Sequence, residues 1–378
     1  MGDVYSGYRV IRPTVDPALH GILRAAVGHG LEGGAPWPDE PLSEDLFRHA
    51  LRFAVRDRLI GVLAEAAIDG TLPLLPDQLD QLTKHHTGSQ VQMLNIEQLL
   101  LRVADSFGSA GIDFRVLKGA ALSHLFYADP SWRTAADLDL LIPSDRFDDA
   151  VTTAIKDLDG EQRVPEVRAG FDREFGKESM VRIGPVELDL HRTFVTGPFG
   201  LTIDLDDLFD GRTEIAIGGQ RVLALSPEHQ FLHACYNAAL GDYPVRLGSV
   251  RDLLLCRRHL EIDLSRIIAK AEHWHGTAVV QRAAELVIEI AGRDVAGGFT
   301  ELAALSVPRR QAWLLRSYLS PARSYSRPLA SLAVIPGARA RLRYGWAIVA
   351  PSRTYLDSRG WTKSKHFRRA VRRLLGHD

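Results

Sequence analysis

The chain has 378 residues, of which 46% are apolar and 25% are charged. This composition is typical of folded globular domains and excludes a disordered chain, a collagen, a coiled coil and a disulfide scaffold. The formal net charge is -1, but residues 309–378 carry 16 Lys and Arg against two Asp, so the rest of the chain is acidic. At roughly 150 residues per domain, the length predicts two to three domains.

The sequence predicts a cytoplasmic protein without a membrane span. Its two cysteines, Cys235 and Cys256, are not in a Cys-x-x-Cys spacing. Unpaired thiols in a chain of this length are typical of a reducing compartment. The sequence contains no run of about 18 apolar residues and no secretory signal segment, so we expect no part of it to enter a membrane.

Residues 1–110 are predicted to form an N-terminal helical region. Residues 1–40 are rich in Gly and Pro and are expected to be an irregular lead-in. Between residues 44 and 68 the apolar side chains roughly follow the helical period of 3.6. A longer helix follows, which Gly108 is expected to end, and one of its faces carries Ile96, Leu100, Val103 and Phe107.

Residues 111–225 are predicted to form a compact mixed β core. A short strand at 114–117 is followed by a helix at 119–126, and a buried strand at 138–142 ends at Pro143. Two hairpins are then expected, because pairs of alternating strands flank tight-turn residues. These are 179–183 and 186–190 around Gly184-Pro185, and 213–217 and 220–225 around Gly218-Gly219.

Residues 226–308 are predicted to form a helical domain, in which Ser226 caps the first helix and Pro227 is its first helical residue. Further helices are expected at about 246–260, 263–275 and 277–291. Residues 309–378 form a basic C-terminal segment. The predicted fold class is therefore α+β, with a mixed β-sheet core flanked by N-terminal and C-terminal helical regions.

The most informative stretch is Asp137-Leu138-Asp139-Leu140-Leu141-Ile142. Residues two apart on a strand point to the same face, with Cα atoms about 6.6 Å apart, so Asp137 and Asp139 are expected side by side. Two adjacent carboxylates are unfavourable unless a cation lies between them, and oxygen ligands at this spacing suit Mg²⁺. A lone Asp-x-Asp is also compatible with the solvated end of a strand.

A second strand offers a further carboxylate. In Val186–His191, the residues Glu187, Asp189 and His191 alternate onto one face. Three carboxylates that hold two ions about 3.5–4 Å apart are typical of in-line displacement at phosphorus. Asp189 is the expected third ligand, and Glu187 replaces it if the strand register differs.

Phosphate contacts are expected just after the first strand of the core. Lys118 and Gly119 stand where that strand ends and a helix begins, a geometry that points free N–H groups at an anion. Arg133, four residues before Asp137, is a second candidate for neutralising phosphate charge. The alternatives are a surface lysine at Lys118 and a loop arginine paired with Asp129 at Arg133.

The run from Val116 to Pro143, VLKGAALSHLFYADPSWRTAADLDLLIP, resembles the signature of the uncharacterised nucleotidyltransferase family within the DNA polymerase beta-type superfamily. The similarity continues at Val186–Arg192 and at Leu225-Ser226-Pro227-Glu228, and covers residues 46 to about 292. It implies a nucleotidyltransferase core that moves a nucleoside monophosphate from an NTP to an acceptor hydroxyl and releases pyrophosphate.

The resemblance also implies roles for individual residues. Asp137, Asp139 and Asp189 would be the catalytic residues and the ligands of two Mg²⁺ ions, and Asp189 would accept the proton of the attacking hydroxyl. Gly119 would lie against the triphosphate. The wider superfamily has Gly-Ser where this chain has Gly119-Ala120, so a hydroxyl contact to phosphate is lost, and Lys118 can replace its charge but not its geometry.

The basic segment interleaves Lys and Arg with aromatic residues, a composition that suits RNA through phosphate contacts and base stacking. The alternative is a tail that packs against the acidic body. The members are Arg339, Arg341, Arg343, Lys363, Lys365, Arg368, Arg369, Arg372 and Arg373 with Tyr344, Trp346, Tyr355, Trp361 and Phe367. Besides an Mg²⁺-dependent transferase with a small-molecule, protein or RNA acceptor, the sequence is compatible with a toxin-like tRNA nucleotidyltransferase and with a catalytically silent RNA- or protein-binding relative.

Overall fold

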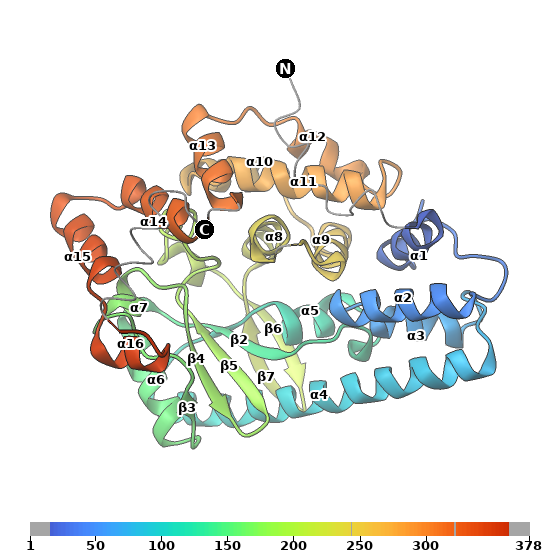
Figure 1. The fold of residues 1–378 in the computed structure, drawn as a ribbon, viewed down its shortest axis with the longest axis horizontal. Helices are drawn as coiled ribbons and strands as arrows, with labels where there is room; N and C mark the ends of the chain where they lie inside the picture. Colours follow the sequence, from blue (N-terminus) through green and yellow to red (C-terminus); the bar gives the residue numbers. More distant parts are fainter. Residues whose placement is uncertain (1–15, 243, 321–322, 363–378) are drawn as a thin grey trace.

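The computed structural model describes residues 16–242, 244–320 and 323–362. A mixed sheet of seven strands, in the order β3-β4-β5-β2-β1-β7-β6, forms the centre of the fold (Figure 1). The strands are β1 (Arg115–Val116), β2 (Asp137–Leu141), β3 (Glu161–Gln162), β4 (Glu178–Ile183), β5 (Val186–His191), β6 (Thr213–Ile217) and β7 (Gln220–Ala224). The predicted α+β fold class is confirmed.

Helices precede, interrupt and follow the strands. Before and within the sheet region lie α1 (Pro17–Gly28), α2 (Glu44–Arg56), α3 (Ile60–Ile68), α4 (Pro76–Ser109), α5 (Lys118–Phe126), α6 (Phe147–Lys156) and α7 (Phe171–Glu174). After it lie α8 (Pro227–Tyr236), the π-helical turn η4 (Asn237–Gly241), α9 (Leu247–His259), α10 (Leu264–His273), α11 (Thr277–Ala291), α12 (Thr300–Ala303), α13 (Arg309–Leu319), α14 (Arg323–Val334), α15 (Ala338–Val349) and α16 (Arg353–Ser358).

Both predicted hairpins are present. In β4–β5, Ile183 pairs with Val186 across Gly184-Pro185, and in β6–β7, Ile217 pairs with Gln220. Gly218 and Gly219 adopt φ angles of +57° and +82°, which two-residue turns of this kind require and glycine adopts without steric cost. Ser226 caps α8 by accepting a hydrogen bond from the N–H of His229, as the sequence predicts.

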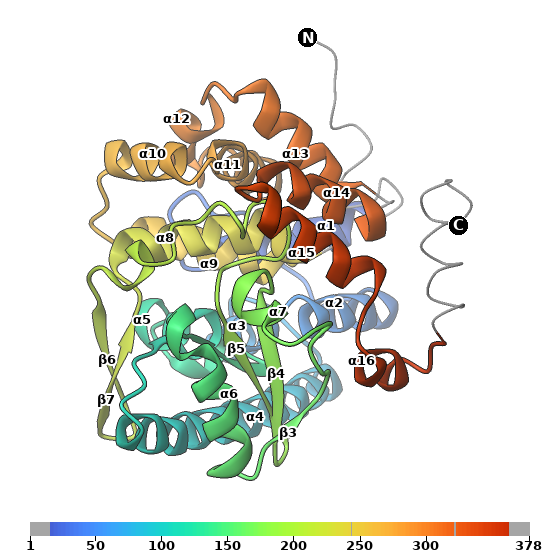
Figure 2. The ribbon, with the colours of Figure 1, turned by 90° about the vertical axis from the view of Figure 1, so that its left-hand side faces the viewer.

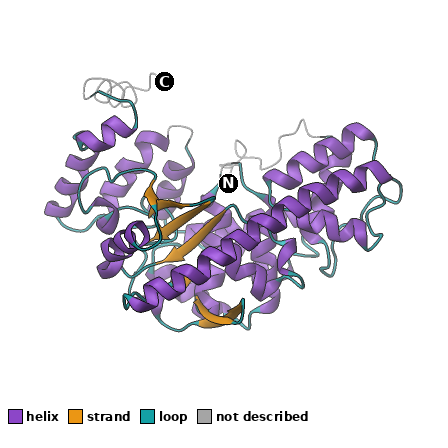
Figure 3. Cartoon of the chain, turned by 90° about the horizontal axis from the view of Figure 1, so that it is seen from below, coloured by secondary structure: helices purple, strands orange, loops and turns teal. Residues whose placement is uncertain are grey.

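The two faces of the sheet differ in chemistry. Leu138 and Leu140 of β2 and Leu188 and Leu190 of β5 belong to one hydrophobic core with α4 and α6. The long helix α4 lies across the strands on this side, as Figure 3 shows from below. Because side chains alternate along a strand, the intervening carboxylates point to the opposite face, toward the C-terminal helices.

A second hydrophobic core joins helices that are far apart in the sequence. It combines side chains of α1, α2 and α3 with those of α8, α9 and α11. The division of the chain after residues 110, 225 and 308 stays a prediction, but the first and third of these regions share this core.

One expectation for the N-terminus is wrong. Residues 1–40 were expected to be irregular, but Pro17–Gly28 form α1, with Asp16 accepting a hydrogen bond from the N–H of Ala18 as its N-cap. Leu19, Ile22 and Leu23 are buried in the helical core, and this packing stabilises a segment whose weak periodicity did not reveal it. Residues 1–15 lie outside the described part.

Cys235 and Cys256 are both buried and free. Within the described ranges, none of the helices combines the length and the apolar character that crossing a membrane requires.

Candidate active site

Parallel pairing of β2 with β5 brings the predicted carboxylates together. Asp139 pairs with Asp189, and Asp137 pairs with Glu187, so these four side chains share one face of the sheet. This register agrees with the expected position of Asp189 beside Asp139, and the assignment of Asp189 as the third ligand stays a prediction. Asp189 is the neighbour of Asp139, whereas the Glu187 carboxylate lies 4.0 Å from the Arg163 guanidinium.

Asp139 is almost completely buried, and one of its oxygens has two partners. Lys118 Nζ lies 2.8 Å and His191 Nε2 lies 2.7 Å from Asp139 Oδ1. A carboxylate can only accept, so His191 Nε2 carries the proton and donates it. Burial alone would raise the pKa of Asp139, but Lys118 and His191 outweigh it and hold the pKa far below its usual range.

Asp189 has the opposite electrostatic environment. Burial, together with the nearby negative charges of Glu178, Asp139 and Asp137, raises the pKa of its carboxyl to about 8. Glu178 comes from the neighbouring strand β4 and contacts Lys177, with a distance of 2.5 Å between Nζ and Oε2. A dense group of carboxylates whose charges disfavour one another is an environment that a bound cation stabilises.

The donor atoms fit a hard divalent cation. Ligand atoms from Asp139, Asp189 and His191 all lie within 4.8 Å of one another. Asp139 Oδ2 and Asp189 Oδ1 are buried and have no hydrogen-bond partner. Buried polar atoms are normally satisfied, so these two oxygens point to a ligand, and carboxylate oxygens suit Mg²⁺ or Mn²⁺. His191 orients Asp139, as residues behind a metal ligand commonly do.

A pocket of about 550 Å³ lies over these carboxylates. Such a volume is within the range of about 300–1,000 Å³ typical of small-molecule sites. Its floor includes Asp137, Asp189 and Glu178, and Lys118 lies beside them. Part of the wall is the π-helical turn η4, which contributes Asn237 and Gly241, and π-helical turns occur frequently at functional sites.

Several lining residues were not predicted from the sequence. Arg58, from the corner between α2 and α3, lies with its Nη2 3.6 Å from Asp137 Oδ1, and Arg246 precedes α9. Glu178 and Lys177 were also missed. No sequence pattern marked these four residues, whereas His191, which does not line the pocket, was marked by its alternation with Asp189 along β5.

Gly119 and Arg133 do not line the pocket. The Arg133 side chain is 3% exposed and pairs with Asp252 of α9 at 2.7 Å, so neither the expected nucleotide contact nor the alternative pairing with Asp129 is supported. A Cβ at Gly119 would lie 2.9 Å from Ala135 Cβ, which explains the glycine by close packing. Contact between the Gly119 backbone and a triphosphate stays a prediction.

The described part of the basic segment packs against the body and reaches the pocket. Arg343 of α15 pairs with Glu174 of α7 at 2.5 Å, and both helices lie at the same end of the molecule (Figure 2). From α14 and α16, Arg327, Tyr355 and Arg359 line the pocket. The packing alternative therefore holds for α15, and the segment also completes the wall of the site.

The aromatic residues of this segment differ in accessibility. Tyr344 is buried against Phe171 and Phe175, with ring centroids 5.8 and 5.4 Å apart, so its ring is not available to a base. Trp346 is 61% exposed. Phe367 and the cations from Lys363 onward lie outside the described residues.

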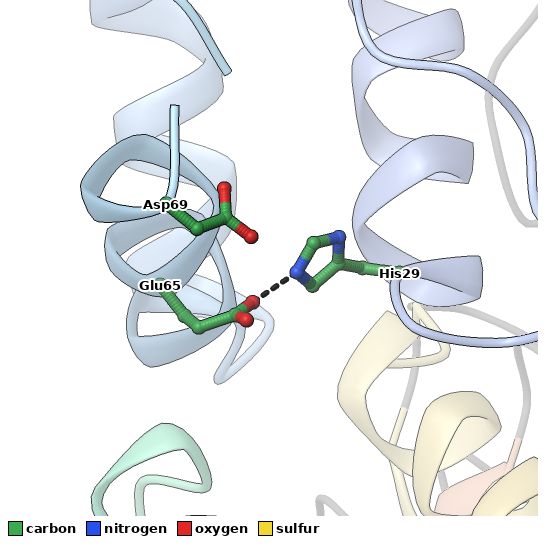
Figure 4. Close-up of side chains that lie close together, drawn as sticks. All are labelled: His29, Glu65 and Asp69. Atoms are coloured by element: carbon green, nitrogen blue, oxygen red, sulfur yellow. Dashed lines mark hydrogen bonds and ion pairs between the residues drawn. The ribbon is translucent and has the colours of Figure 1, made fainter. Parts of the chain in front are cut away.

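A second cluster, His29, Glu65 and Asp69, also brings three potential ligand atoms together (Figure 4). The indole N–H of Trp37 donates to His29 Nδ1 at 3.0 Å, so the proton of the neutral ring is on Nε2, which hydrogen-bonds Glu65. Asp69 accepts from the N–H of Thr71 at 2.8 Å. Both ring nitrogens are therefore committed, and the cluster links α1 to α3.

The site thus combines a mixed sheet, buried carboxylates and a pocket lined by cations. A family model described as uncharacterised nucleotidyltransferase matches residues 43–292, and the chain belongs to this family. The predicted family is therefore confirmed. Among curated proteins, none matches the sequence significantly.

Two solved structures show partial likeness. The antibiotic-resistance factor ANT(2'')-Ia is 15% identical over 52% of this chain and 96% of that chain, with a TM-score of 0.36. An antigenic nucleotidyltransferase-like protein from Paracoccidioides brasiliensis is 20% identical over 56% of this chain and 94% of that chain, also with a TM-score of 0.36. At these TM-scores the likeness carries no further conclusion.

Proposed function

We propose that this protein is an Mg²⁺-dependent nucleotidyltransferase that moves a nucleoside monophosphate from an NTP to an acceptor hydroxyl. The observation that carries the proposal is the register of β2 with β5. It places the buried carboxylates of Asp139 and Asp189 side by side, with one unpartnered oxygen on each, and Asp189 and Asp137 line a pocket of about 550 Å³. Family membership supports the same reaction class.

Asp137, Asp139 and Asp189 are the residues that would hold two Mg²⁺ ions. When bound, Mg²⁺ supplies charge neutralisation and alignment of the phosphates. The chain itself positions the carboxylates: His191 orients Asp139, and the strand pairing holds Asp189 next to it. Lys118 adds a positive charge that can face phosphate oxygens.

The proposed step is an in-line displacement at the α-phosphorus. The acceptor oxygen forms a bond to this phosphorus, and the bond to the oxygen that bridges to the β-phosphate breaks. Pyrophosphate leaves with that electron pair. Asp189 accepts the proton of the acceptor hydroxyl and passes it to solvent, a general-base role that a carboxylate next to the acceptor can fill.

The acceptor is a small molecule, a protein side chain or an RNA end. An RNA acceptor, as in a toxin-like tRNA nucleotidyltransferase, is favoured by Arg327, Tyr355 and Arg359, which bring the basic segment into the wall of the pocket. A catalytically silent relative is the competing function, and its support is Ala120, which is buried where the wider superfamily has serine.

A transfer assay separates these functions. Each NTP is incubated with Mg²⁺ and cell-extract fractions, pyrophosphate release is measured, and modified acceptors are identified by their mass increase. The proposal expects release with at least one NTP and none after Asp139→Asn. A silent binding module would release no pyrophosphate and would bind RNA with an affinity that falls steeply with salt and is insensitive to Asp139→Asn.

A further inference from the structure

Two cations from distant parts of the chain face the two carboxylates of the Asp-x-Asp motif. Lys118 Nζ lies 2.8 Å from Asp139 Oδ1, and Arg58 Nη2 lies 3.6 Å from Asp137 Oδ1. Both cations line the pocket. Each motif carboxylate therefore has its own positive partner inside the site.

Both cations have an unusual backbone conformation. Among the described residues, four non-glycine residues have positive φ, and two of them are Arg58 at +62° and Lys118 at +25°. A side chain in this region costs of order 1–3 kcal/mol and persists where the surrounding structure imposes it, commonly at functional sites. The fold thus holds both residues in strained positions that direct them toward the carboxylates.

The position of Arg58 is imposed by the corner that carries it. The carbonyl of the preceding residue, Asp57, accepts a hydrogen bond from the N–H of Gly248 at 3.0 Å. A Cβ at Gly248 would lie only 2.4 Å from that carbonyl oxygen, so the start of α9 packs directly against the corner. The close contact between Asp57 and Gly248 therefore places Arg58, a residue of the N-terminal helical region, at the pocket.

Positive charge is crowded around Arg58. Its pKa is lowered by burial and by the neighbouring Arg133 and Arg246, and the carboxylates of Asp137 and Asp139 offset this only in part. An additional anion at this place would relieve the repulsion among these cations. A triphosphate is an anion of the appropriate chemistry.

We propose that Arg58 is a triphosphate ligand, and that Arg58 and Lys118 are exchangeable counter-ions. Without a nucleotide they neutralise Asp137 and Asp139, and they pair with the phosphates when a triphosphate binds. This inference rests on the proposed function, because it takes the two carboxylates as metal ligands. It adds that the cations oppose metal binding until a triphosphate accepts them.

Because each cation has two roles, as counter-ion of a carboxylate and as ligand of a phosphate, replacing it should change the metal affinity and the triphosphate affinity in opposite directions. Removing a cation next to Asp137 or Asp139 leaves more negative charge for a divalent ion and so strengthens metal binding without nucleotide. The same substitution removes a phosphate partner and so weakens triphosphate binding. A merely structural residue would not shift the two affinities in opposite directions.

The test compares Lys118→Met and Arg58→Met with the wild-type full-length chain. Mn²⁺ binding without nucleotide is measured from the electron paramagnetic resonance signal of free Mn²⁺. Binding of inorganic tripolyphosphate is measured by calorimetry in EDTA. We expect Lys118→Met to tighten Mn²⁺ binding at least about tenfold, and Arg58→Met by less because its pair is longer. Both substitutions should weaken tripolyphosphate binding at least about tenfold.

Arg163→Met is the matched control. Arg163 also faces a carboxylate of the same sheet, Glu187 at 4.0 Å, and Glu187 is the register neighbour of Asp137, but neither lines the pocket. This variant should change both affinities less than twofold. If Lys118→Met does not fold, Arg58→Met carries the test, because the Arg58–Asp137 pair is longer and more exposed.

The outcomes distinguish this inference from the proposed function. If neither the wild type nor any of the variants binds Mn²⁺, the metal site of the proposed function is overturned. If Mn²⁺ binds the wild type and both variants equally, or if Arg58→Met leaves tripolyphosphate affinity unchanged, the metal site stands and the counter-ion exchange is overturned.

Discussion

Two clusters in this molecule each bring a histidine and two carboxylates within 4.8 Å of one another, yet their chemistry differs. In the cluster of His29, Glu65 and Asp69, both ring nitrogens are committed and Asp69 has a backbone partner. In the cluster of Asp139, Asp189 and His191, two buried carboxylate oxygens have no hydrogen-bond partner.

The difference shows that proximity of ligand-type residues does not by itself make a metal site. In the first cluster, the His29–Glu65 contact links the end of α1 to α3, and Asp69 accepts a hydrogen bond from the N–H of Thr71. In the second cluster, Asp189 lines the pocket, and one oxygen each of Asp139 and Asp189 has no hydrogen-bond partner. A buried polar atom without a hydrogen-bond partner is costly unless a ligand binds it, so these two oxygens are candidate ligand atoms.

Asp139→Asn gives the largest expected difference between the clusters. It removes a carboxylate that is proposed to bind metal, and the loss of a residue that only supports a metal ligand already lowers metal affinity or activity by about 10–100-fold. We therefore expect pyrophosphate release to fall at least about 100-fold, while Glu65→Gln leaves it unchanged. A loss of activity in Glu65→Gln equal to that in Asp139→Asn would contradict the distinction.

The second-largest expected effect is the pH dependence of metal binding by the pocket cluster. Asp189 has a pKa of about 8, so below this pH a proton must leave before a metal binds. Metal affinity should rise about tenfold per pH unit, or about 100-fold from pH 6 to 8, and level off above pH 8. Mn²⁺ titrations at several pH values check this, and Asp189→Asn should remove the dependence.

The raised pKa of Asp189 also makes the free energy of unfolding depend on pH. The folded state binds the Asp189 proton more tightly than the unfolded state, whose carboxyl has its ordinary pKa. Without metal, the stability contributed by this proton is present at low pH and is lost as the pH rises toward about 8. Thermal unfolding should therefore show a larger Mn²⁺-dependent increase in melting temperature at pH 8 than at pH 6.

His191→Ala tests the role of the histidine in the pocket cluster. It removes the hydrogen bond that orients Asp139, so Mn²⁺ affinity should fall about 10–100-fold. Mn²⁺ affinity is measured from the electron paramagnetic resonance signal of free Mn²⁺, and circular dichroism confirms that the variant is folded. Unchanged affinity would mean that strand pairing alone positions Asp139.

His29→Ala should have the smallest effect on function. It breaks the contacts with Trp37 and Glu65, which we expect to lower the free energy of unfolding by about 1–3 kcal/mol. Urea unfolding measures this, and transfer activity and Mn²⁺ affinity at 25 °C should match those of the wild type. Loss of one bound Mn²⁺ in this variant would show that the first cluster is a metal site after all.

Features that depend on local spacing were predictable. The alternation of a strand placed Asp137 and Asp139 on one face, and the turn glycines Gly218 and Gly219 marked a hairpin. Asp189 was predictable only in part, because the alternation in β5 selects a face but not a register. The pairing of Asp139 with Asp189, and not with Glu187, depends on how β5 docks against β2.

Features that depend on long-range packing were not predictable. The position of Arg133, four residues before Asp137, predicts a phosphate contact, but its partner is Asp252, which the packing of α9 brings to it. Arg58 carries no motif, and only the contact between its corner and Gly248 places it beside Asp137. Likewise, α1 depends on burial against helices that follow the sheet.

The sequence by itself thus determined the class of fold and the strand that carries Asp137 and Asp139, because periodicity and turn chemistry act over a few residues. The family was identified by the resemblance of its motifs. Only the tertiary structure decided which residues surround those carboxylates. It brought in Arg58 from the N-terminal helices and Arg327 and Arg359 from the basic segment to the same pocket. The physical reason is that the contacts between distant segments depend on the packing of whole helices and strands, which no short sequence pattern encodes.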